Sequence, residues 1–380
     1  MTQKGVWDLQ DVRDEYLAGN WTYISATAHN VFVIGEQTDG QLGLNDRASR
    51  SSPVQLPGAW SHIEWGKRFG LGVKSDATLW AWGENDYGSL GQNAVIDYSS
   101  PVQIPGTTWA SAGAVHNQAA AGIKSDGTLW MWGWNSYGEQ GLNDRVARSS
   151  PTQIPGTQWN KVAAGAQRIF ASKTDGTLWA WGISASGTLG LNDNANRSSP
   201  TQIPGTYWDL DSVSSSNYCG DIMACMKTDG TLWGWGNGYY GGVGWNNQIS
   251  YSSPIQIPGT QWGYVAIGNG HWVATKTDGT MWTSGYVAQG QGGYNSTVLY
   301  SSPRQIPGTQ WGYGKYSLAA GRQHSTAVKT DGTMWTWGKN NQGQINTNDK
   351  TNRSSPTQIP GTQWSQVSSG TYINAGYIPQ

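Results

Sequence analysis

The sequence is poor in charge, and it contains no long apolar run. Only 12% of its 380 residues are Asp, Glu, Lys or Arg, and the formal net charge is −1. Such a chain lacks the basic surface that nucleic acids and anionic membranes attract, so we expect no nucleic-acid partner. No segment approaches the ~18 consecutive apolar residues of a membrane-spanning helix, and the N-terminus lacks the pattern of a signal peptide. We therefore expect neither membrane insertion nor signal-directed export.

Cysteine and phenylalanine are also scarce. The two cysteines, Cys219 and Cys225, form no disulfide framework, and we expect both to be small core residues. Phe occurs three times, whereas Trp occurs 24 times and Gly 53 times. Trp is therefore unusually common in this chain, and Phe is nearly absent.

The abundant residues belong to a repeat. A segment close to "SSPTQIPGTQW" occurs seven times, at spacings of 48 to 54 residues. A period near 50 residues is typical of solenoids and propellers. Within one unit, Asp175-Gly176 separates two strand-like runs, which predicts a hairpin, and two further short strands flank it. Four antiparallel strands per unit are typical of a propeller blade.

The chain ends predict how the ring closes. The "KTDGT" hairpin occurs six times and is missing near the N-terminus, while residues 367–378 supply two extra strands. We therefore predict an all-β fold: a seven-bladed β-propeller over residues 21–380, with four-stranded antiparallel blades. One blade combines strands from both termini, which removes open sheet edges.

The repeat also resembles a known family. A "G-x-x-H" segment followed by "AVKTDGTMWTWG-x-N-x-x-G-Q" lies at residues 321–344, and related segments recur in register. This pattern resembles the regulator of chromosome condensation repeat family. The resemblance implies a seven-bladed propeller, in agreement with the repeat count.

Several recurring residues have structural interpretations. Eighteen tryptophans hold fixed repeat positions, and we expect them to pack between blades. Asp and Arg lie four residues apart in four copies and change together elsewhere, so we predict that each pair is in contact; the pairs are Asp46/Arg50, Asp144/Arg148, Asp193/Arg197 and Asp349/Arg353. These loops lack the ligand ladder of a calcium site, and we expect no bound metal.

Catalytic motifs are missing. His116, His271 and His324 occupy one repeat position, where a packing role is favoured over a general base. No Ser-His-Asp order, carboxylate pair or Cys-His set stands out, so we expect no enzyme activity and no cofactor.

Variation between copies points to a binding surface. Strand ends alternate between the two faces of a propeller, and the loops following "WAWG" and "VAAG" share the face where the copies differ. Binding residues commonly lie on such loops. The aromatic residues predicted for this variable face are Tyr87, Trp134, Tyr137, Tyr239, Tyr240, Trp272 and Tyr286. They suit a protein or a glycan, although drift without selection would also produce variation.

The first twenty residues break the repeat and predict a docking helix. Asp8 is a candidate N-cap and Gly19 a candidate stop, and the expected apolar contacts involve Trp7, Leu9, Val12 and Tyr16. The helix could pack on its own propeller. The segment also resembles the short leader of many tailed-phage virion proteins, through Gly5, Trp7, Leu9 and Val12.

That second resemblance implies a virion component. The favoured interpretation is a non-enzymatic propeller of a tail fibre, baseplate or capsid decoration, made in the host cytoplasm. It would contact other virion proteins through residues 1–20 and a host-surface protein or glycan through the variable face. The alternative is a soluble regulator or inhibitor of a partner protein, such as a small-GTPase exchange factor.

Overall fold

The computed structural model describes residues 29–35, 37–114, 118–165, 167–209, 214–215, 221–314, 316–345, 347–369 and 373–379. Within these ranges the chain forms strands and loops, and the one helical element is the 3-10 turn η1 (Ala185–Gly187). None of the described residues forms a helix long and apolar enough to cross a membrane. The docking helix predicted for residues 1–20 lies outside the described residues.

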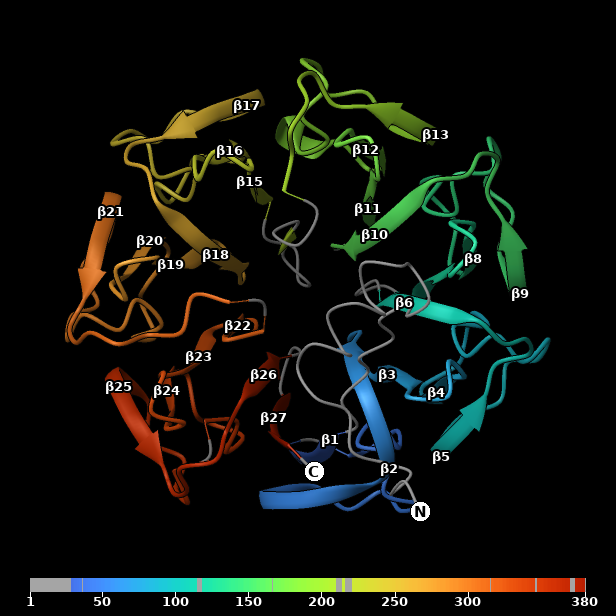
Figure 1. Ribbon diagram of the computed structural model, residues 1–380, viewed down its shortest axis with the longest axis horizontal. Coiled ribbons are helices and arrows are strands. Elements are labelled where there is room, and N and C mark those ends of the chain that lie inside the picture. The colour runs from blue at the N-terminus through green and yellow to red at the C-terminus, as the bar shows by residue number, and fades with distance from the viewer. Residues whose placement is uncertain are drawn as a thin grey trace, which may run out of the picture.

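The strands of the described ranges form six antiparallel sheets around a central axis (Figure 1). One sheet has seven strands: β26 (Gln366–Ser369), β27 (Ile373–Pro379), β1 (His29–Gly35), β2 (Arg50–Trp65), β3 (Phe69–Lys74), β4 (Leu79–Gly83) and β5 (Tyr98–Gln103). The other five sheets have four strands each, with the first strand near the axis and the last at the rim.

The four-stranded sheets follow one another in chain order. They are β6 (Trp109–Ala114), β7 (Ala119–Lys124), β8 (Leu129–Gly133) and β9 (Arg148–Gln153); β10 (Trp159–Ala164), β11 (Arg168–Lys173), β12 (Leu178–Gly182) and β13 (Arg197–Gln202); β14 (Ser214–Ser215), β15 (Ile222–Met226), β16 (Leu232–Gly236) and β17 (Tyr251–Ile257); β18 (Trp262–Ile267), β19 (His271–Lys276), β20 (Met281–Gly285) and β21 (Tyr300–Ile306); and β22 (Leu318–Ala320), β23 (His324–Val328), β24 (Met334–Gly338) and β25 (Arg353–Ile359).

The prediction of seven separate blades is wrong, because the strands in the described part of the chain form six hydrogen-bonded sheets. Strands of the first two repeats share the seven-stranded sheet, since β2 runs unbroken for 16 residues. In five other repeats the chain turns before the next inner strand at a non-glycine residue with φ between 62° and 67°; these residues are Thr108, Gln158, Tyr207, Gln261 and Gln310. The segment "LPGAW" at 56–60 is one residue shorter than "IPGTTW" at 104–109, and it lacks this residue. The outer strand of one repeat therefore continues directly as the inner strand of the next.

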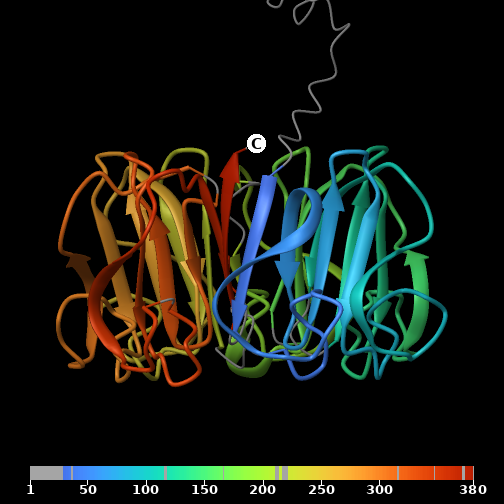
Figure 2. The ribbon, with the colours of Figure 1, turned by 90° about the horizontal axis from the view of Figure 1, so that it is seen from below.

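The predicted closure by both chain ends is confirmed. β1 pairs with β27 over seven residue pairs, from His29 with Pro379 to Gly35 with Ile373. This places β26 and β27 beside β1 and β2 in one sheet. Figure 2 shows the C-terminal end at one face of the disc.

Tryptophan packing joins neighbouring sheets, as the sequence predicts. One core cluster combines Leu129 and Met131 of one sheet with Trp159 and Trp181 of the next. The Trp181 indole also donates a hydrogen bond across the boundary to the Glu139 carbonyl, at 2.7 Å. The same bond recurs from Trp82, Trp132, Trp235 and Trp337 to carbonyls of the preceding repeat. Each such indole therefore supplies both buried apolar area and a satisfied polar contact.

Candidate binding face

The two faces of the disc are built from different loops. We call the face with the Asp-Gly-Thr hairpins and the turns before β6, β10 and their equivalents the hairpin face, and the opposite one the variable face. On the variable face, the Gln118 side-chain amide donates to the Glu84 carboxylate at 2.5 Å, and the backbone N–H of Trp134 donates to the backbone carbonyl of Gln118. Loops of two kinds thus meet there, as the alternation of strand ends predicts.

A single hydrogen-bond network recurs on the hairpin face. In one copy, Asp175 accepts bonds from the Thr177 N–H and hydroxyl at 2.9 and 2.6 Å, and the Trp179 indole donates to the same hydroxyl. These bonds hold the pKa of Asp175 below its ordinary value. The Lys173 ammonium lies 4.7 and 4.6 Å from the ring centroids of Trp159 and Trp179.

The copies of this network leave little room for specificity. The Asp-Thr-Trp triads are Asp76/Thr78/Trp80, Asp126/Thr128/Trp130, Asp175/Thr177/Trp179, Asp229/Thr231/Trp233, Asp278/Thr280/Trp282 and Asp331/Thr333/Trp335. Because these side chains satisfy one another, the hairpin face is a structural one.

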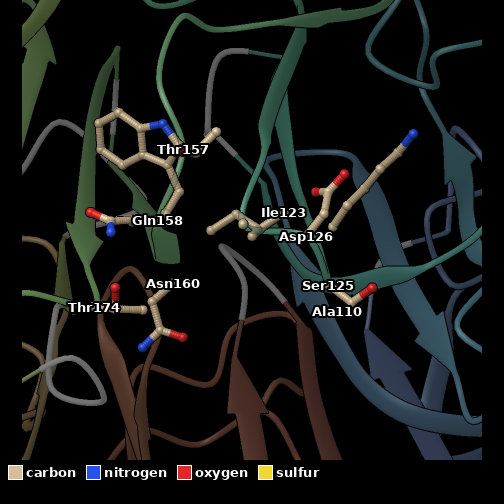
Figure 3. Close-up of a pocket in the computed structure, with 11 residues that line it drawn as sticks. Ala110, Ile123, Ser125, Asp126, Thr157, Gln158, Asn160 and Thr174 are labelled. Atoms are coloured by element: carbon tan, nitrogen blue, oxygen red, sulfur yellow. The ribbon is translucent and has the colours of Figure 1, made fainter.

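A pocket of about 350 Å³ opens where two hairpin-face turns meet (Figure 3). Ser125 and Asp126 line one side, and Thr157, Gln158 and Asn160 line the other. Asp126 belongs to the recurring network, where it accepts the Thr128 hydroxyl at 2.7 Å. The pocket therefore follows from the way that successive repeats stack.

On the variable face, Tyr87 and Trp134 form an aromatic pair across a repeat boundary. Their ring centroids lie 4.2 Å apart at an interplanar angle of 88°, and Tyr87 is 43% exposed. We call this pair the Tyr–Trp patch. The loop that carries Tyr87 also carries Glu84, whose carboxylate lies 3.9 Å from Arg68, and Arg68 lies 3.3 Å from Asp39.

Tyr239, Tyr240 and Tyr286 form a second group, which we call the tyrosine patch. The Tyr240 ring lies 4.9 Å from both Tyr239 and Tyr286, and Tyr239 is 66% exposed. The patch joins the β16–β17 and β20–β21 loops, which lie across the ring from the β4–β5 and β8–β9 loops of the Tyr–Trp patch (Figure 1).

Trp272 does not belong to the variable face, so this part of the site prediction is wrong. Its side chain is fully buried, and its ring packs against that of Trp262 with a distance of 6.0 Å between the ring centroids. Trp272 pairs with Ser284, which replaces the second tryptophan of the "LWAWG" strand in this repeat. The indole fills the space against Gly244 that Trp235 fills against Gly190. The tryptophan has therefore moved to the adjacent strand while keeping its place in the core.

Tyr137 is half-buried, and its backbone N–H donates to the Glu139 carboxylate at 2.8 Å. Glu139 is fully buried, and this burial raises its pKa to about 7. Sequence reasoning missed this group, although an internal signal existed. Three other copies carry glutamine at this position: Gln41, Gln291 and Gln344. The remaining copies carry Ser89, Thr188 and Gly242, so Glu139 is the one charged residue at this repeat position.

The predicted Asp–Arg contacts are confirmed. The four pairs have N–O distances of 2.5 to 2.7 Å, with Asp144 and Arg148 at 2.7 Å. In a divergent copy, the Asn247 amide donates instead to the Tyr251 hydroxyl at 2.9 Å. These contacts close the loop on itself. Among the described residues, no group of His, Cys, Asp and Glu is arranged to hold a metal ion.

The recurring histidines are core groups where they are described. His271 and His324 are fully buried, and His271 Nε2 lies 3.1 Å from the Ser325 hydroxyl. Burial, followed by the proximity of His324, lowers the pKa of His271 to about 3. Cys225 is buried, as predicted. His116 and Cys219 lie outside the described residues.

A second buried charge was also missed. Arg168, which is almost fully buried, occupies the position of these histidines and pairs with Asp221 at 2.9 Å across a repeat boundary. The two residues are 53 apart in sequence, close to one repeat length. Complementary charges one repeat apart were the available signal.

The geometry thus defines a β-propeller with one structural face and one face of diverse loops. Its sequence matches the regulator of chromosome condensation (RCC1) repeat at residues 76–119, 126–171, 175–213 and 331–376, and a second description of that repeat at 316–344. The chain belongs to this repeat family. No curated protein matches it by sequence.

Solved structures share the fold. Prp20p from Saccharomyces cerevisiae, described with its binding to Gsp1p and histones, is 19% identical with a TM-score of 0.81; the match covers 94% of this chain and 93% of that chain. Human WBSCR16 is 21% identical with a TM-score of 0.80, covering 93% and 99%. Yeast RCC1 (Prp20) bound to Kap60 is 18% identical with a TM-score of 0.79, covering 100% and 94%. At these identities the likeness shows the fold.

Proposed function

We propose that this protein is a non-enzymatic binding protein that regulates a protein partner by holding it against the variable face. The observation that supports this most is the Tyr–Trp patch. Tyr87 is exposed and its ring packs against half-buried Trp134, while Glu84 of the same loop as Tyr87 pairs with Arg68. Aromatic anchors within a polar rim are typical of protein interfaces.

The neighbouring structures support a partner-binding role. Prp20p is described as binding Gsp1p and histones, and yeast RCC1 as bound by Kap60. For the present chain, the class of partner is open, and a small GTPase is one candidate. A soluble regulator accounts for the family membership and for the confinement of divergence to one face.

Site-specific photo-crosslinking tests the proposal. A photoreactive phenylalanine analogue replaces Tyr87 in one variant and Tyr207 in another. Tyr207 is the matched control, because it is 73% exposed but lies on the turn before the isolated bridge at Trp208, on the hairpin face. We expect a discrete protein adduct from position 87 alone, with its yield reduced by Trp134→Ala. Equal adducts at both positions, or none at position 87, would contradict the proposal. If the protein adduct from position 87 contains a small GTPase, faster nucleotide release from that GTPase in the presence of this protein would identify an exchange factor.

Virion display is a second candidate. It rests on the phage-leader resemblance at Gly5, Trp7, Leu9 and Val12, which lie outside the described residues. In that case the chain would be found in phage particles, attached to other virion proteins. Mass spectrometry of purified particles, before and after a high-salt wash, tests this. Stoichiometric, wash-resistant peptides would support it, and their absence would remove it.

A further inference from the structure

The tyrosine patch differs from the Tyr–Trp patch in charge. No Asp, Glu, Lys or Arg occurs between Asp229 and Lys276, or between Asp278 and Arg304. Lys276 and Asp278 belong to the hairpin-face network, where Lys276 lies over Trp262 and Asp278 accepts the Thr280 hydroxyl. The β16–β17, β18–β19 and β20–β21 loops therefore bring no formal charge to the variable face.

The rings of the patch form a stepped surface. Tyr239 meets Tyr240 at 87°, and Tyr240 meets Tyr286 at 58°. Gly270 allows the β18–β19 loop to approach these rings, since a Cβ there would lie 3.2 Å from the Tyr286 Cβ and 3.8 Å from Tyr240. Its φ of 79° also favours glycine. The three loops are thus packed into one surface.

Amide groups lie beside the rings. Asn237 accepts a hydrogen bond from the Tyr239 N–H at 2.8 Å, and half-buried Asn269 precedes Gly270. The Asn237 N–H also donates to the Asp221 carbonyl, and the Asp221 carboxylate is paired with Arg168. The negative charge of Asp221, which borders the patch, is therefore already balanced by Arg168. What the patch offers a ligand is aromatic faces, phenol hydroxyls and amides.

We propose that the tyrosine patch binds a neutral oligosaccharide. The C–H face of a sugar ring packs on an aromatic ring, and sugar hydroxyls exchange hydrogen bonds with amide and phenol groups. An acidic glycan would require an Arg or Lys partner, which these three loops lack. The charged residues that border the three loops, Asp221 with Arg168 and Arg322, come from other loops. This site is separate from the Tyr–Trp patch, across the ring.

Isothermal titration of the full chain with defined hexasaccharides tests the proposal. The probes are maltohexaose, cellohexaose, chitohexaose and mannohexaose, with hexagalacturonate as the acidic comparison. We expect at least one neutral probe to bind, with a Kd that is the same at 50 and 500 mM NaCl because no charges attract it. Tyr240→Ala should weaken binding about tenfold or more, whereas Tyr240→Phe should keep most of it because the ring face remains.

Tyr87→Ala is the matched control, because Tyr87 and Tyr240 hold the same place in their loops and each is 43% exposed. It should leave sugar binding unchanged, and the partner-binding role is read out separately by the photo-crosslinking at position 87 with and without Trp134→Ala. Thermal unfolding confirms that each variant is folded. Binding of hexagalacturonate alone, binding of no neutral probe, or an unchanged Kd in folded Tyr240→Ala would overturn the proposal. Because each patch has its own variant and readout, failure of sugar binding is distinguishable from failure of the partner-binding role.

Discussion

Glu139 is expected to make the protein less stable above neutral pH. Its pKa rises from an ordinary 4.5 to about 7 on folding because the carboxyl group is buried. A raised pKa in the folded state means that the favourable contribution is complete below about pH 4.5 and is lost as the pH rises through 7. The difference of 2.5 units corresponds to about 3 kcal/mol at 1.36 kcal/mol per unit, as an order of magnitude.

Glu139→Gln should remove this pH dependence. The change is well matched, because Gln41, Gln291 and Gln344 accept the same bond from the backbone N–H two residues earlier, at 2.8 to 2.9 Å. The variant keeps the bond and loses the buried charge. We expect it to be more stable than the wild type by about 2–3 kcal/mol at pH 8 and nearly equal at pH 5.

Urea unfolding followed by tryptophan fluorescence at both pH values measures the difference. The reciprocal change, Gln291→Glu, provides the control, because Gln291 is fully buried in the same contact. It should destabilise the protein at pH 8 more than at pH 5. If Glu139→Gln retains the wild-type pH dependence, the assignment of that dependence to Glu139 is wrong.

Three further changes test the core and the loops. Trp272→Ser should lower the free energy of unfolding by about 3–5 kcal/mol, because it opens a cavity. Adding Ser284→Trp should restore most of this stability, because the double variant reproduces the pairing of Ser325 with Trp337. A double variant as unstable as Trp272→Ser would contradict the exchange of strands. His271→Phe, which places the residue of Phe69 at this repeat position, should reduce the loss of stability between pH 6.5 and 4. The reason is that the lowered pKa of His271 lets the unfolded chain bind a proton that the folded chain does not bind. An unchanged dependence of the unfolding free energy on pH in urea titrations would refute this. Arg148→Ala should lower stability by only about 0.2–1 kcal/mol, since its pair with Asp144 is partly exposed, and a larger loss in the same assay would show that the pair does more than close its loop.

Much of the fold was predictable because each copy of the repeat forms the same strands and turns. The Asp-Gly hairpins, the interblade tryptophans and the pairing of β1 with β27 all follow from residues that recur in register. The merging of two repeats into one sheet was not predicted. It depends on one missing residue between Gly58 and Trp60, whose effect on the chain direction requires coordinates to see.

The candidate site was predictable in part. Exposed Tyr87, Tyr239 and Tyr240 lie where the loop argument placed them. Trp272 was misplaced because its exchange with Ser284 is a contact between two strands, which a comparison of single repeat positions cannot detect. Buried Arg168 was missed for a similar reason, since its partner Asp221 comes from the neighbouring repeat. Buried Glu139 was missed although its repeat position, which holds glutamine in three other copies, carried a signal.

The pairing of β1 with β27 also determines how the ring responds to force. His29 and Pro379 are directly opposite at the same end of this antiparallel pair. Tension applied at these two residues therefore loads the hydrogen bonds one after another, starting from His29 and Pro379, instead of all at once. Opening requires only that β1 and β27 peel apart from that end. We expect the closed ring to resist heat and denaturant through its tryptophan core, and yet to open at low force when it is stretched from its ends.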